Sequence, residues 1–135
     1  MLDAGCGLGH GLQALREAYP SAQVHGIGWS WPLRLVCALR CPWARVRQGG
    51  IWRADWRPCQ LVDLFQRPES MARALDKAAA LMQPGSWRVS LEFEASGWRA
   101  HHVVCLSDGC PVWVYLAPFS RAAAPVAART NQLPQ

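Results

Sequence analysis

The stretch Leu2-Asp3-Ala4-Gly5-Cys6-Gly7-Leu8-Gly9 opens the chain and carries three glycines at alternate positions. A glycine-rich turn between a strand and a helix lets backbone N–H groups approach a bound ligand closely. The dinucleotide fingerprint Gly-x-Gly-x-x-Gly needs its third glycine at position 10, which is His10 here. The observed spacing is Gly-x-Gly-x-Gly with Asp3 two residues ahead, and this spacing argues against a nicotinamide dehydrogenase.

Downstream of the glycines, short apolar strands alternate with amphipathic helices. The spacing predicts helices over 9–19, from Ser30 to Arg40, and from a cap at Glu69-Ser70 onward. Their expected inward residues are Leu8, Leu12, Leu15 and Tyr19, then Leu33, Val36 and Cys37, then Met71, Leu75, Ala78, Ala79 and Met82. Strands are predicted over 23–27, 44–48, 61–65 and 87–93, and a hairpin pairs 101–106 with 112–116 around Asp108-Gly109. This order predicts an α/β fold with a mostly parallel sheet, helices on both faces and a C-terminal antiparallel hairpin.

The amino-acid composition limits which classes of function are possible. Of 135 residues, 51% are apolar and 17% are charged, which excludes a disordered chain. The net charge of +5 comes from thirteen arginines and one lysine without a dense run, which favours a solvated basic surface. A nucleic-acid-binding module is an alternative that rests on the net charge alone. Six cysteines form no Cys-x-x-Cys pair, and His101-His102 alternate across a strand, so we expect free thiols and no metal site. The start lacks a signal-peptide pattern and no apolar run could span a membrane, which predicts a cytoplasmic protein.

Several motifs resemble class I S-adenosylmethionine-dependent methyltransferases in their order along the chain. Leu2 to Gly9 resembles the first motif of that family, and Leu81-Met82-Gln83-Pro84-Gly85-Ser86 resembles the Leu-x-Pro-Gly-Gly turn before the fifth strand. Weaker likenesses are Val24 to Ile27, Gln48 to Ile51 and Leu61 to Phe65. The resemblance covers about residues 1–116 and implies a Rossmann-like domain over 1–119, followed by a flexible Ala/Pro/Arg tail over 120–135. It implies S-adenosylmethionine as cofactor, with contacts from Asp3, Gly5, Cys6, Gly7, Gly9, Gly28, Trp29, Gly50, Ile51, Trp52 and Phe65.

The chain departs from the family at two acids. The ribose-binding acid that usually ends the second strand is replaced by Gly28, and the adenine-binding acid after the third strand by Gly50. Trp29 and Trp52 stand beside these positions, where either could stack on an adenine or simply pack. The strand before Gly5 is only Met1-Leu2-Asp3, so we expect an N-terminally truncated, late-started or decayed copy of the family.

No catalytic residue is identified from the sequence. Gln66 and Glu69, after the fourth strand, are candidates for touching an acceptor, although Pro68-Glu69-Ser70 also suits a plain helix start. Asp63 lies in an apolar strand and needs either a partner such as Arg67 or a place at the polar end of the strand. The Asn-Pro-Pro-Tyr signature of amino-group methylases of nucleic acids is absent, which favours a small-molecule acceptor. The competing function is a non-catalytic methyltransferase-like protein that acts by binding a partner.

Overall fold

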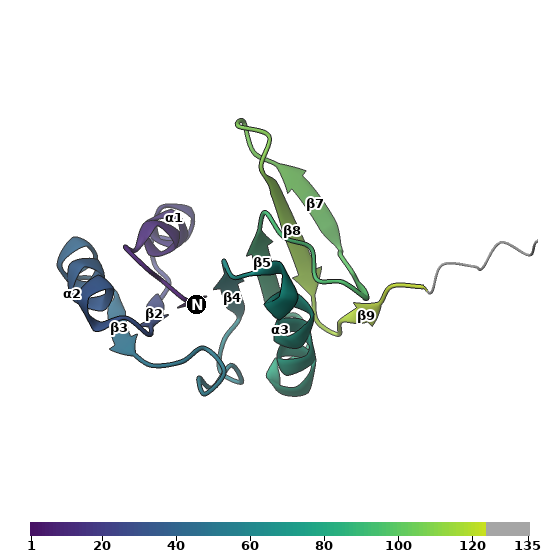
Figure 1. The fold of residues 1–135 in the computed structure, drawn as a ribbon, viewed down its shortest axis with the longest axis horizontal. Coiled ribbons are helices and arrows are strands. Elements are labelled where there is room, and N and C mark those ends of the chain that lie inside the picture. The colour runs from purple at the N-terminus through teal and green to yellow at the C-terminus, as the bar shows by residue number, and fades with distance from the viewer. Residues whose placement is uncertain (124–135) are drawn as a thin grey trace, which may run out of the picture.

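The computed structural model describes residues 1–123, and its centre is a seven-stranded sheet of order β3-β2-β1-β4-β5-β8-β7 (Figure 1). Five strands run parallel: β1 (Leu2–Ala4), β2 (His25–Gly28), β3 (Arg45–Gln48), β4 (Leu61–Leu64) and β5 (Trp87–Leu91). Strand β8 (Pro111–Leu116) is antiparallel both to β5 and to β7 (His102–Cys105). The predicted mostly parallel sheet and closing hairpin are therefore confirmed.

Three helices cover the two faces of the sheet. Helices α1 (His10–Ala18) and α2 (Trp31–Arg40) share one face, where Leu12, Leu15 and Cys37 form a buried cluster with strand residues. Helix α3 (Pro68–Leu81) covers the other face through Met71, Leu75 and other residues of a second cluster. Crossovers between parallel strands are right-handed. The chain adds β2 and β3 on one side of β1, and β4 and β5 on the other side. The helices α1 and α2 therefore lie on one face of the sheet and α3 lies on the other.

The helices differ from the prediction in which residues they bury. Leu33 and Val36 of α2 are 43% and 41% exposed, and only Cys37 of the three predicted inward residues is buried. The reason is that α2 packs on two short strands, β2 and the edge strand β3, which cover a narrow stripe of the helix. Leu8 and Tyr19, at the two ends of α1, are also exposed.

Helix α3 begins one residue before the predicted cap. Pro68 occupies its first turn, where a missing N–H costs nothing, and Arg67 is the N-cap residue. Ala74 is buried in place of the predicted Ala79, which is exposed. The buried stripe of the helix therefore runs through Met71, Ala74, Leu75 and Ala78.

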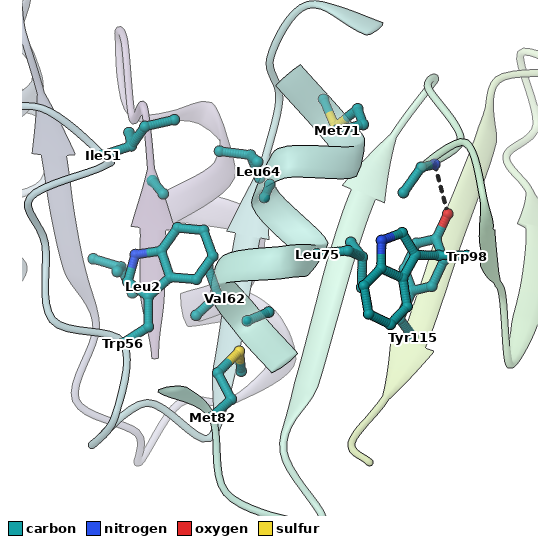
Figure 2. Packing of buried hydrophobic residues seen from close by; sticks show 14 residues of the cluster. Leu2, Ile51, Trp56, Val62, Leu64, Met71, Leu75, Met82, Trp98 and Tyr115 are labelled. Atoms are coloured by element: carbon teal, nitrogen blue, oxygen red, sulfur yellow. Dashed lines mark hydrogen bonds between the residues drawn. The ribbon is translucent and has the colours of Figure 1, made fainter. Parts of the chain in front are cut away.

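The connection from β3 to β4 runs as a loop over residues 49–60, where a helix would complete the alternation (Figure 1). Ile51 and Trp56 of this loop are buried in the α3-side core, as Figure 2 shows. The Lys77 ammonium of α3 donates hydrogen bonds to the carbonyl oxygens of Trp52 at 2.6 Å and Ala54 at 2.7 Å. These contacts hold the loop against α3.

Besides the main sheet, the chain forms a two-stranded ribbon that the sequence did not indicate. Strand β6 (Trp98–Arg99) pairs with β9 (Ser120–Arg121), so two residues of the predicted tail lie in a strand. The rest of that tail, from residue 124, lies outside the described residues. No helix within residues 1–123 is long and apolar enough to cross a bilayer.

Candidate functional site

The glycine run forms the loop from β1 into α1. Gly5, Gly7 and Gly9 have φ angles of 98°, 50° and 91°, a region that residues with a side chain rarely adopt. The N–H groups of Gly5 and Cys6 both donate to the carbonyl oxygen of Ile27, at 2.8 and 2.9 Å. The loop is thus tied to the end of β2, and Gly9 becomes the N-cap residue of α1.

Two amides of this loop have no partner in the described part of the chain. The N–H groups of Gly7 and Leu8 make no backbone hydrogen bond there. A Cβ placed on Gly7 would meet only the Gly5 carbonyl oxygen, at 4.0 Å, so the space beside it is open. Free amides next to a helix N-terminus can bind an anionic group such as a carboxylate.

Three buried thiols lie beneath the loop. Cys37 Sγ approaches Cys6 Sγ to 3.7 Å, and a Cβ on Gly9 would come within 3.0 Å of the sulfurs of Cys37 and Cys41. Cys37 of α2 and Cys41, the C-cap residue of that helix, therefore lie together beneath the loop. Burial raises the pKa of Cys6 to about 12, so its thiol stays protonated and acts as packing. No group of three His, Cys, Asp or Glu side chains among residues 1–123 is placed to hold a metal ion.

Two carboxyl groups face one another between the sheet and α1. Asp3 of β1 is directly opposite Asp63 of β4, and both carboxylates crowd Gly11, whose added Cβ would lie 2.6 and 3.0 Å from their oxygens. Burial, followed by the charge of Asp63, raises the pKa of Asp3 to about 7, while the backbone N–H of Leu12 lowers it. Burial also raises the pKa of Asp63. It forms no ion pair with Arg67 in the described chain, so that predicted pairing is wrong.

Gly11 was missed by sequence reasoning, although its signal was present. It is the fourth glycine in a run at positions 5, 7, 9 and 11, and only a residue without a side chain fits above the carboxyl pair. Asp3 is 5% exposed and directed at this helix turn. Its carboxylate therefore positions α1 and the loop that precedes it.

The ends of β2 and β3 bring Gly28, Trp29 and Gly50 together. The Trp29 side chain is 78% exposed, and its ring lies 3.8 Å from where a Cβ on Gly50 would be. Trp52, in contrast, is held in place by the Arg73 guanidinium 4.1 Å from its ring centroid and by contact with the core. Trp29 is thus the tryptophan free to meet a ligand, while Ile51 is part of the core.

The end of β4 supplies the third side of the site. Phe65 is 53% exposed and stacks on Phe93 with ring centroids 6.2 Å apart. The Gln66 side-chain amide lies against the loop, 2.7 Å from the position of a Cβ on Gly5. Exposed apolar side chains from Leu8, Trp29 and Phe65 therefore surround the carboxyl ends of β1, β2 and β4, where open α/β sheets bind ligands.

The structure superimposes on solved methyltransferases. An RNA methyltransferase from Salinibacter ruber in complex with S-adenosyl-L-homocysteine aligns over 93% of this chain and 82% of its own, with a TM-score of 0.77 and 21% identity. An rRNA methylase from Streptococcus thermophilus aligns over 90% of this chain and 86% of its own, with a TM-score of 0.61 and 10% identity.

The fold is that of a class I methyltransferase. A geranyl diphosphate methyltransferase in complex with GPP and sinefungin has the same methyltransferase fold, with a TM-score of 0.56 and 16% identity, but this chain spans only 36% of it. No family model and no curated protein sequence matches the chain. The methyltransferase fold therefore rests on the structural superposition and on the strand order.

Proposed function

We propose that this chain binds S-adenosylmethionine at the glycine loop and transfers its methyl group to an acceptor. The observation that carries the proposal is the pair of unpartnered amides at Gly7 and Leu8, beside open space at the N-terminus of α1. These amides suit the carboxylate of the methionine end. Structural neighbours solved with S-adenosyl-L-homocysteine or sinefungin bound support the same ligand class.

The adenosine half of the ligand would meet apolar surface here. Trp29 offers an exposed indole above Gly50, and the sequence provides no acid at positions 28 and 50 for the ribose and adenine. A hydrogen bond to a charged group contributes about 1.5–3 kcal/mol. We therefore expect binding roughly ten- to a hundredfold weaker than the same site would show with a ribose-binding acid.

Methyl transfer makes few chemical demands on the protein. The sulfonium supplies the activated methyl group, and the chain has to hold an acceptor nucleophile in line with it. Gln66 is the polar side chain that the structure brings against the glycine loop. Its amide would orient an acceptor by hydrogen bonding at that point.

Calorimetric titration with S-adenosyl-L-homocysteine tests the proposal. Saturable binding in the micromolar range supports it. A folded chain that binds nothing at millimolar ligand overturns it and leaves the non-catalytic binding function.

A separate variant tests whether the missing ribose-binding acid weakens binding. Gly28 has an ordinary φ angle, and a Cβ there would sit 3.5 Å from Cys6 Sγ, a normal contact, so Gly28→Asp fits the structure. We expect Gly28→Asp to tighten binding tenfold or more and Gly28→Asn, the uncharged match, to gain less. Equal affinity of both variants and the parent would refute the ribose argument.

A further inference from the structure

A cavity of about 670 Å³ lies on the α3 side of the sheet, over β1, β2 and β3. It exists because the β3–β4 connection is a loop there. One wall comes from the sheet, with His25 and Ile27 of β2 beside Arg45 and Arg47 of β3. The other wall is the loop from Arg53 to Gln60. This cavity is separate from the glycine loop, at which the cofactor is proposed to bind.

The walls of the cavity carry unpaired positive charge. The ion pairs of residues 1–123 are Arg57–Asp55 and Arg121–Asp76, so Arg45, Arg47 and Arg53 are free of acidic partners there. Asp55 is the acid in the lining, and the Arg57 guanidinium binds both of its oxygens at 2.9 Å. Burial lowers the pKa of His25, and the positive charges of the N-terminal ammonium, Arg45 and Arg47 add to that effect.

The arginines are presented by ordered backbone. Arg45 and Arg47 are alternate residues of one strand, so their side chains leave the same face about 7 Å apart. Arg53 stands between Trp52 and Ala54, the two residues whose carbonyl oxygens Lys77 holds. Guanidinium groups on both walls of one cavity can contact several phosphates of the same ligand.

The surrounding segment favours a nucleic acid as the source of those phosphates. Between Glu17 and Asp55 the sequence has no acid but has five arginines and four tryptophans. Trp31 begins α2 on the opposite face of the sheet, so the cavity itself offers cationic side chains and is not lined by a tryptophan. Positively charged grooves in proteins that bind single-stranded nucleic acids follow the phosphate backbone, and this cavity supplies the positive charge for such contacts.

We propose that the cavity over β2 and β3 binds the phosphate backbone of a single-stranded nucleic acid through Arg45, Arg47 and Arg53. This binding does not depend on methyl transfer. The sequence predicted a small-molecule acceptor, and its arginines are scattered along the chain. The fold gathers three of them around one cavity.

Fluorescence anisotropy with a fluorescein-labelled 12-nucleotide single-stranded RNA tests the proposal. We expect the parent chain to bind at 50 mM salt and Arg45→Gln/Arg47→Gln/Arg53→Gln to bind at least tenfold more weakly. Each lost phosphate contact should reduce the slope of log affinity against log salt by about 0.7, or about 2 for three contacts.

The matched comparison removes equal charge at two sites. Arg99→Gln/Arg121→Gln, on the β6–β9 ribbon, is the control for Arg45→Gln/Arg47→Gln. Equal RNA affinity of these two double variants, or no RNA binding by the parent chain, overturns the proposal.

Two further titrations separate the alternatives. Titrations with AMP and inorganic phosphate identify the source of the bound phosphate. If the chain binds the 12-nucleotide RNA no more tightly than it binds AMP, the cavity is a site for small phosphate compounds and the nucleic-acid proposal is overturned. Titrating S-adenosyl-L-homocysteine into the arginine variants keeps the two functions apart, since we expect its affinity to be unchanged by them.

Discussion

The buried carboxyl pair of Asp3 and Asp63 should make the stability of this protein fall as pH rises. Asp3 is 5% exposed, and burial with the charge of Asp63 raises its pKa from the ordinary 3.8 to about 7. Between these two values the folded chain holds a proton that the unfolded chain has released. Stability is therefore highest below pH 4 as far as this group is concerned, and falls until about pH 7.

The size of the effect follows from the distance between the two pKa values. At about 1.4 kcal/mol for each pH unit, the interval from 3.8 to about 7 corresponds to about 4 kcal/mol. Asp3→Asn replaces the carboxyl group with a neutral amide of the same shape. We expect the variant to gain about 4 kcal/mol relative to the parent chain between pH 4 and pH 8.

Urea unfolding at pH 4, 6 and 8 measures this gain. Asp76→Asn, which removes an exposed carboxylate on α3, is the control and should change the pH profile by less than about 1 kcal/mol. A constant difference between Asp3→Asn and the parent at all three pH values would refute the electrostatic reasoning.

Three further predictions concern the glycine loop and the core. Gly9→Ala should cost more stability than Gly7→Ala, because both need a positive φ but only Gly9 meets two sulfurs at 3.0 Å; equal losses in urea unfolding would contradict this. Arg88 is fully buried with Nε and one Nη lacking partners within residues 1–123, so Arg88→Met, which removes these unsatisfied groups, should leave the free energy of unfolding unchanged or raise it by about 1–3 kcal/mol. A thermal midpoint well below that of the parent would count against it. Tyr115→Phe removes the acceptor of the buried Ala95 N–H at 2.8 Å (Figure 2) and should cost about 1–3 kcal/mol in the same assay, whereas no loss would show that water replaces the hydroxyl.

Local signals predicted most of the fold. Helices α1 and α2, the parallel strands and the Asp-Gly hairpin follow from apolar spacing and turn residues, which act over a few positions. The β6–β9 ribbon was missed because two-residue strands have no periodicity to read. The prediction of which α2 residues face inward was wrong because burial depends on how much of the sheet lies beneath a helix.

The candidate site was predictable where backbone conformation demands one residue type. Gly5, Gly7 and Gly9 were found because their positive φ angles require glycine. The choice between Trp29 and Trp52 was not available from the sequence, since it depends on Arg73 and the core holding Trp52. The position of Gln66 against Gly5 likewise depends on two strands lying side by side.

The opening glycine run by itself determined the turn from β1 into α1, because positive φ angles favour glycine and act on local backbone geometry. Only the tertiary structure decided that Asp3 faces Asp63, that three thiols lie beneath the loop and that Arg45, Arg47 and Arg53 share a cavity. Those residues are far apart along the chain. Their pKa values and their shared charge arise from distances that the packing of strands sets.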